Sequence, residues 1–422
     1  MSLADNSFNN VLNFYNNRIS ENIISESVYR DQSAVINFLA EVNNLVVTNN
    51  LPDISLEEQG KFDKSKLVIK NQWASHPSIQ ERIKRLEKTG FLSDNNLDTL
   101  ANNIFTDISE LQKQMTNKIF EAVCYQGEAK IISPDKFIEE FKQETLSNSF
   151  AKDYNGYYDN KNPINFDLNE SNSIGDRVGY SELYSNEMVD LVYSAIAIQN
   201  DTETLKCISN NSLSIKTFDY DGVRYKRNDA DGLVGKLKAE LESINMKIKR
   251  NDTDVYHFFR RLENEQNKPE KLECIYKEFF EFDKTYDSKY DIYTQLLNEL
   301  QFVSVTTPFE LIRINFNRIK PQEETLKQEI NQLLSNSIFT TEITQEIKQN
   351  LERYISKTWE YFGRTSYFDE HLNLLYTSMH NYAYLLSRKY FLLKKELLTY
   401  QEELIKNHTQ HTLGAMETAA QI

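Results

Sequence analysis

The sequence is poor in the residues that interrupt helices. Its 422 residues include only 11 glycines and 7 prolines, whereas a fold of many short strands needs frequent turn residues. Hydrophobic residues make up 40% of the chain and aromatic residues 12%, which is enough for a packed core. The composition therefore predicts a mostly α fold with long helices, divided at this length into two or three domains.

Cysteine is also scarce. The three cysteines, Cys124, Cys207 and Cys274, are odd in number and far apart in the sequence. They can form neither a disulfide framework nor a C-x-x-C metal knuckle. We expect buried thiols in a reducing compartment such as the cytoplasm.

Long apolar runs and an excess of basic residues are missing as well. No stretch approaches the roughly 18 apolar residues of a transmembrane helix, and "MSLADNSFNN" lacks the pattern of a signal peptide. The formal net charge of −15 argues against nucleic-acid binding and against docking on an anionic membrane. We expect no nucleic-acid partner, and membrane contact only through segments outside this chain.

Hydrophobic periodicity predicts where the first helices lie. Residues 5–48 have the spacing of two helices, and residues 93–123 that of a third, with Asp94 or Asn95 as its N-cap. Ser133 followed by Pro134 predicts the start of another helix. Residues 151–176 are rich in turn residues and have no period, so we expect a long surface loop there or an excursion around another element.

One β-hairpin interrupts the helical pattern. Residues 213–227, "LSIKTFDYDGVRYKR", alternate apolar and polar residues around Asp221-Gly222, a pair that favours a type I′ turn. Helices follow it, and the last of them, of about thirty residues, is expected near 367–405. Residues 408–422 are predicted to be a disordered tail.

The most specific stretch is "WASHPSIQERIKRL", residues 73–86. A helix that begins at Pro77 places Ile79, Ile83 and Leu86 on one apolar stripe, with Gly90 at the C-cap. Arg82 lies about 60° from the centre of that stripe, so it faces protein rather than solvent.

An inward-facing arginine needs a carboxylate partner, because an unpaired buried charge is costly. His76, directly before the helix, projects toward the same side as Arg82. Spacing alone leaves two interpretations open. One is a structural pair, in which Arg82 binds a neighbouring acid and His76 caps the helix; the other is half of an active site.

This stretch resembles the C-terminal signature of the zinc metalloendopeptidases that include HtpX and the CAAX prenyl proteases. The residues that match the signature are Ser75, His76, Pro77, Glu81, Arg82, Ile83 and Leu86. The two preceding helices are similar to that family's segment before the signature, so the resemblance covers about residues 5–90. It implies that His76 hydrogen-bonds the oxyanion formed during peptide hydrolysis and that Arg82 holds a glutamate zinc ligand.

The chain departs from the family in one respect. The family's chemistry needs H-E-x-x-H, two histidines one turn apart on zinc with a glutamate as general base. The six histidines form no such pair; they are His76, His257, His371, His380, His408 and His411. We take His257 and His380, which lie among aromatic residues, as packing residues, and His408 and His411 as part of the solvated tail.

The resemblance and this departure together predict a C-terminal portion of a longer zinc protease. Residues 1–90 would end its catalytic domain and residues 91–407 would form a helical accessory domain. Zinc would be bound in the full-length parent and not by this chain, which alone would be inactive. The expected partners are a polypeptide substrate and the missing N-terminal catalytic segment, which could also anchor the parent in a membrane.

Two alternatives remain open. The chain could be a non-enzymatic helical protein-interaction or scaffold domain, or a regulatory subunit that completes the active site of another polypeptide. An acidic partner for Arg82 within the chain would favour the scaffold, whereas exposed apolar surface on the helices of residues 5–90 would favour the fragment. Aromatic residues on several sides of the later helices indicate packing between helices or a groove for an extended polypeptide.

Overall fold

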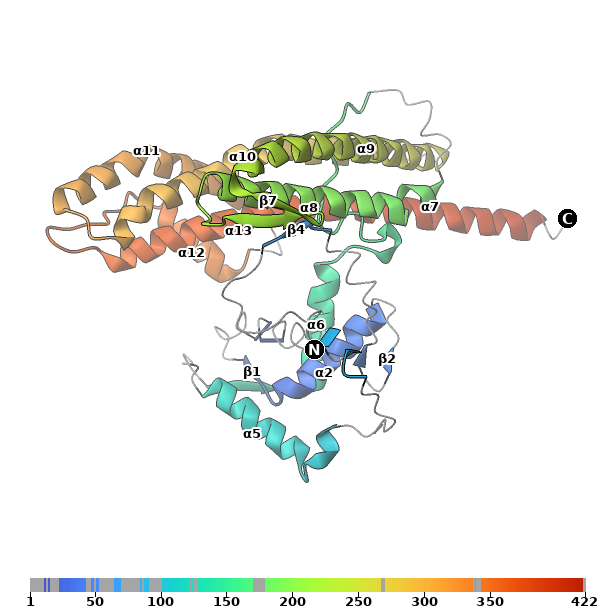
Figure 1. Ribbon diagram of the computed structural model, residues 1–422, viewed down its shortest axis with the longest axis horizontal. Helices are drawn as coiled ribbons and strands as arrows, with labels where there is room; N and C mark the ends of the chain where they lie inside the picture. Colours follow the sequence, from blue (N-terminus) through green and yellow to red (C-terminus); the bar gives the residue numbers. More distant parts are fainter. Residues whose placement is uncertain are drawn as a thin grey trace. The chain divides into compact units, whose positions relative to one another are not determined.

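The computed structural model describes residues 11–12, 14–15, 23–42, 47–48, 51–52, 64–69, 84–85, 87–90, 101–121, 123, 128–169, 179–266, 270–336, 338 and 343–419. The fold is mostly α with small β-sheets, which confirms the predicted class (Figure 1). Contacts divide the chain into two compact units. Unit 1 contains Met1–Asp159 and Asn186–Asn245, and unit 2 contains Asn160–Ser185 and Met246–Ile422. This division does not follow the expected boundary at residue 90.

The first part of unit 1 is a small α/β layer. Strands β1 (Ile23–Ser25) and β5 (Lys130–Ile132) pair in parallel beside helices α2 (Val28–Val42), α5 (Ile108–Phe120) and α6 (Pro134–Ser147). A short hairpin of β2 (Val47–Thr48) and β3 (Leu51–Pro52) follows α2. The shared core is formed by Val11, Phe14, Tyr15, Val28, Val35, Phe120, Ile132 and Phe137.

The helix starts in this layer follow local capping signals. Ser133 accepts a hydrogen bond from Lys136 N at 3.4 Å with Pro134 in the first turn, as the sequence predicts. The helix expected over 93–123 is shorter. A 3₁₀ turn (Ala101–Ile104) precedes it, and α5 begins after Asp107, whose side chain accepts from Glu110 N at 3.1 Å. The expected caps at 94 and 95 lie outside the described residues.

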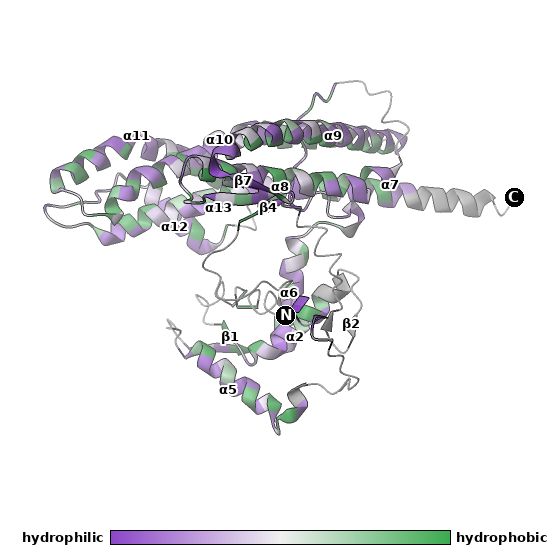
Figure 2. Ribbon diagram, viewed as in Figure 1, coloured by the Kyte–Doolittle hydropathy of each residue, from purple (hydrophilic) through white to green (hydrophobic). Residues whose placement is uncertain are grey.

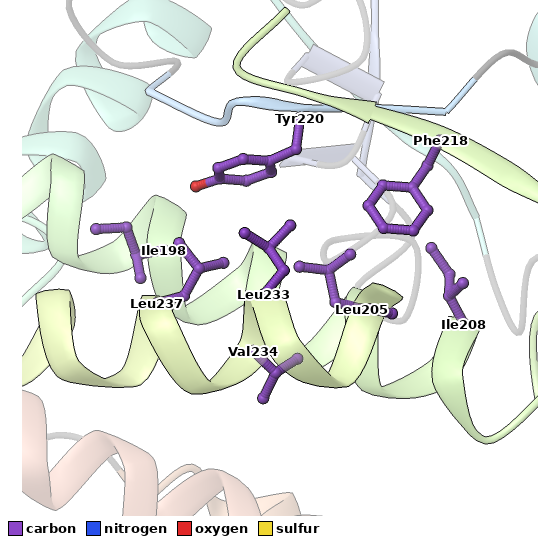
Figure 3. Packing of buried hydrophobic residues seen from close by; sticks show 9 residues of the cluster. Ile198, Leu205, Ile208, Phe218, Tyr220, Leu233, Val234 and Leu237 are labelled. Carbon is purple, nitrogen blue, oxygen red and sulfur yellow. The ribbon is translucent and has the colours of Figure 1, made fainter. Parts of the chain in front are cut away.

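The second part of unit 1 packs a three-stranded antiparallel sheet on two helices. Its strand order is β4 (Leu67–Val68), β6 (Thr217–Tyr220) and β7 (Val223–Lys226). The predicted hairpin is confirmed, since Asp221 and Gly222 both have positive φ, 51° and 76°. Figure 3 shows Phe218 and Tyr220 pointing toward aliphatic residues of α8 (Asn186–Ser209) and α9 (Ala230–Glu265).

Unit 2 is built from long helices. Helix α10 (Lys271–Glu299) packs against α13 (Asp369–Ala419) and α11 (Phe309–Leu334), and α12 (Gln345–Ile355) packs against α13. The short helix α7 (Tyr180–Leu183) lies in the same unit. Helix α13 has 51 residues and reaches Ala419. It therefore extends beyond the expected end near 405 and into the expected disordered tail, whose residues include no proline to stop it.

Other expectations need correction. Of the two alternatives for the segment from residue 151, the surface loop is wrong, because Tyr154, Tyr157, Tyr158 and Phe166 are buried. The other alternative, an excursion around another element, agrees with the packing of Phe166 against Tyr256 of α9. The aromatic side chains of this segment pack in the interior, although its sequence is rich in turn residues. Two thiols are not buried as expected: Cys207 is partly exposed and Cys274 is exposed, while Cys124 lies outside the described residues. Within the described part of the chain, no helix combines the length and apolar character needed to cross a membrane.

A buried ion pair fastens the segment after residue 160 to α9 in unit 2. Lys161 Nζ lies 2.7 Å from Asp252 Oδ1, and the two side chains are 10% and 1% exposed. Asp252 also accepts a hydrogen bond from Ile164 N at 2.8 Å. Burial lowers the pKa of Lys161, and the neighbouring Asp252 carboxylate opposes that change.

Replacing Asp252 should therefore lower the stability of unit 2. We expect Asp252→Asn to lower the free energy of unfolding of unit 2 by about 3 kcal/mol, because the Lys161 ammonium would face a neutral amide. Urea unfolding followed by circular dichroism measures the change. Glu352→Gln, in the exposed Lys348–Glu352 pair, is the control and should change stability by less than about 0.5 kcal/mol. Equal effects of the two variants would contradict a stabilising role for the buried pair.

Two glycine substitutions in unit 1 should act in opposite directions. Gly222→Ala places a Cβ at φ +76° and should destabilise the hairpin by about 1 kcal/mol. Gly235 lies on the exposed side of α9 with no atom near an added Cβ, so Gly235→Ala should stabilise by about 0.5–1 kcal/mol. Urea denaturation midpoints test both, and a stabilising Gly222→Ala would rule out the type I′ turn.

Candidate functional site

The two site residues predicted from the sequence, His76 and Arg82, lie outside the described residues. The structure does describe residues 84–85 and 87–90, at the end of the helix that the sequence predicts from Pro77. Lys84 and Arg85 are helical and exposed, as expected for the face opposite the apolar stripe. Gly90 has φ +62° and its N–H donates to Glu87 O at 3.2 Å, which confirms the C-cap.

The helices before this motif bury their apolar faces within the chain itself. On α2, Val28 and Val35 are fully buried, and they pack with Phe120 of α5 and Phe137 of α6. Among the described residues between 5 and 90, Val68 is the one large apolar side chain that is exposed. Residues on both sides of position 90 thus form one core.

A buried carboxylate lies within that core. Asp31, on the first turn of α2, has no solvent exposure. Its Oδ2 accepts hydrogen bonds from Tyr15 Oη at 2.6 Å and from Ser25 Oγ. Ser25 Oγ also accepts from Ser27 N at 2.9 Å. Asp31 Oδ1 has no hydrogen-bond partner among the residues that the structure describes.

The environment of Asp31 changes its protonation. Burial raises the pKa of its carboxyl from 3.8 to about 6; the Ser25 and Tyr15 hydroxyls oppose the rise and the Glu26 charge adds to it. Burial, with the Asp31 charge, also raises the pKa of Tyr15. The cluster can therefore exchange a proton near pH 6, and Oδ1 can accept a hydrogen bond from a donor or a cation.

Two other buried carboxylates, both in unit 2, have their hydrogen-bonding capacity used by the fold. Glu263 accepts from Arg260, from Tyr400 and from Leu272 N. Glu323 Oε1 accepts from Tyr354 and Tyr361, and burial raises the pKa of its carboxyl. These groups hold helices together and leave little capacity for a ligand.

Sequence analysis missed all three carboxylates, although two left a signal. Glu323 lies in the buried stripe of α11. Asp31 lies in the same way on α2, three residues after Val28 and four before Val35, and all three side chains are buried. An acid at an apolar position of a helical period indicates a buried, hydrogen-bonded group.

His257 and His380 pack against aromatic rings, as expected, but His408 is not in a solvated tail: it lies on α13, with Nδ1 3.5 Å from Glu265 Oε2. His257 lies against the Tyr256 ring, and His380, although exposed, lies against the Tyr293 ring. Tyr390 of α13 packs among Phe279, Phe282 and Tyr286 of α10. Among the described residues, no three His, Cys, Asp or Glu side chains are placed to hold a metal ion.

Comparison with protein-family models, with curated proteins and with solved structures finds no match for this chain. The assignment of any function therefore depends on the residues themselves.

The raised pKa of Asp31 predicts a pH dependence of stability. The folded state holds this proton more tightly than the unfolded chain, so stability present at pH 4 is lost as pH rises through 6. A rise of two pKa units corresponds to about 3 kcal/mol. Asp31→Asn removes the carboxyl that binds this proton. The variant should therefore not lose stability between pH 4 and pH 7, even if its stability differs from that of the wild type by the same amount at every pH.

Urea-dependent pulse proteolysis at pH 4.5 and 7.5, with unit 1 fragments identified by mass spectrometry, measures the change. Asp135→Asn, at an exposed carboxylate in the first turn of α6, should keep the wild-type pH dependence. If Asp31→Asn also kept it, another group would be responsible.

Proposed function

We propose that this chain is a C-terminal portion of a zinc-dependent metalloendopeptidase, in which it supplies substrate-binding and structural residues. The observation that carries the proposal is the sequence from Ser75 to Leu86, which predicts a helix with His76 before it and Arg82 beside its apolar stripe. The C-cap at Gly90 supports the helical setting that the signature requires. On this proposal His76 contacts the reacting peptide and Arg82 holds a metal ligand in place.

The zinc ligands would have to come from outside this chain. The sequence lacks H-E-x-x-H, and the described residues contain no metal-binding cluster. The residues present thus do not fit a zinc site on their own, and the metal belongs to the proposal only through the missing catalytic segment.

Two features of unit 1 support contact with such a segment. Within the described residues, β1 and β5 form a sheet of only two parallel strands, whereas parallel sheets usually have more strands and are covered on both faces. Ile131 of β5 is 68% exposed. Leu111 and Met115 form an exposed apolar stripe on α5, where hydrophobic and hydrophilic residues alternate (Figure 2).

The second candidate is a helical protein-interaction or scaffold domain without catalytic function. It is favoured by the complete burial of Val28 and Val35 on α2 within this chain. A fragment cut from a larger domain would expose such a face. The two candidates differ in whether the natural protein contains the zinc-binding sequence.

The first test is peptide mapping of the natural protein, isolated from its source cells by immunoprecipitation. We expect peptides upstream of Ala4 that contain H-E-x-x-H. A protein without that sequence would leave the scaffold as the better account.

The second test uses variants of the full-length parent. Arg82→Ala should lower zinc affinity by about 10–100-fold, because a metal ligand would lose its support. His76→Ala should lower kcat by about 100–1000-fold and leave zinc content unchanged. Arg85→Ala is the matched control, because Arg85 is exposed on the same helix. Equal effects of Arg82→Ala and Arg85→Ala would contradict the proposed roles.

A further inference from the structure

Helix α13 carries a lysine whose amine lies on an aromatic surface. Lys389 is half-buried, and its Nζ lies 4.8 Å from the centre of the Phe282 ring on α10. Phe282 is itself buried, and its ring makes T-shaped contacts with Tyr286 and Tyr390. The Lys389 amine is therefore covered on one side by rings of α10 and α13, and open to solvent on the other.

The amine of Lys389 also lacks an oxygen partner. It makes neither a hydrogen bond nor an ion pair with any residue that the structure describes. An aromatic ring supplies no hydrogen-bond acceptor, so it offsets the cost of covering an ammonium group only in part. Four other lysines of unit 2 with buried or half-buried side chains each donate to an oxygen atom. They are Lys161, Lys289, Lys327 and Lys394.

The charges that face Lys389 come from two neighbouring helices. Glu278 and Lys289 lie on α10, and Glu329 lies on α11, where it pairs with Lys289. Burial lowers the pKa of Lys389, and the Glu278 charge opposes that fall. The Lys289 charge adds to the fall, and the Glu329 charge opposes it. This setting favours the neutral amine, which is the nucleophilic form of a lysine side chain.

We propose that Lys389 is a site of N-acylation by small acyl thioesters. The neutral amine attacks the thioester carbonyl carbon, the C–S bond breaks, and the leaving thiolate takes up the proton that the nitrogen loses. The products are an amide at Lys389 and a free thiol. Acylation removes the positive charge near Lys289 and leaves an uncharged group on the Phe282 ring. The site lies in unit 2 and does not depend on the proposed peptidase function.

The probe is S-acetyl-N-acetylcysteamine, a small acetyl thioester, applied to the full chain at pH 7.5. The unreacted amines are then acetylated with deuterated acetic anhydride after unfolding, and mass spectrometry of peptides gives the fraction that reacted at each lysine. We expect Lys389 to react at least about fivefold faster than Lys357. Lys357 is the matched control, because it is exposed and its Nζ also lies over a ring, 4.2 Å from the centre of Trp359.

A variant of α10 tests whether the neighbouring charges set the rate. Glu278 is exposed, and its charge favours the ammonium form of Lys389. Glu278→Gln should therefore raise the acetylation rate of Lys389 about two- to threefold. Glu281→Gln, at an exposed acid of the same helix that is not among the charges facing Lys389, should leave the rate unchanged. Circular dichroism checks that both variants are folded, as expected for changes at exposed positions.

Two results would overturn the proposal. One is a Lys389 rate equal to or below that of Lys357, because half-burial would then only block the amine. The other is a fast Lys389 whose rate is the same in the wild type and in Glu278→Gln. Binding of the probe, rather than the state of the amine, would then explain the rate.

Discussion

The hydrogen bonds accepted by Asp201 determine how the sheet of unit 1 is built. Its carboxylate accepts a hydrogen bond from Lys66 N, 135 residues earlier in the sequence, and so holds the start of β4 against α8. Without an acceptor at this position, the Lys66 N–H would lose its protein partner, and β4 would lose this link to α8. The position of β4 sets one edge of the three-stranded sheet, beside a hollow of about 400 Å³ that β4 and α8 line together.

The same arrangement recurs in unit 2. Asp252 accepts from Ile164 N, and Glu263 accepts from Leu272 N. In each case a buried carboxylate on a helix accepts a hydrogen bond from a backbone N–H of another segment. A cation or a hydroxyl donates to the same carboxylate. Asp31 differs, because its partners are the hydroxyls of Tyr15 and Ser25. Burial raises the pKa of its carboxyl, and the two hydroxyl hydrogen bonds oppose that rise without cancelling it.

Local features could be predicted from the sequence because their causes are local. Ser133-Pro134, Asp221-Gly222 and Gly90 each act within four residues, and each has the predicted conformation. Features that join distant segments could not be predicted. The pairing of β4 with β6 depends on Leu67 and Tyr220, and no pattern within either segment specifies the other.

The candidate site residues also differ in whether their signal is local in the sequence. His76 and Arg82 were found through a contiguous motif, and their roles stay a prediction. The hollow beside β4 gives no signal in the sequence, because Leu67 and Asn200, which both line it, are far apart in the sequence. Helix α9 continues through the polar residues 250–254, because Asn251 donates to Leu183 O and Asp252 pairs with Lys161.

The core around Asp31 changes what the peptidase proposal must explain. Phe120 and Phe137 share that core with Val28 and Val35, so a catalytic domain that included α2 would also include α5 and α6. Its end would then lie near residue 147 rather than 90.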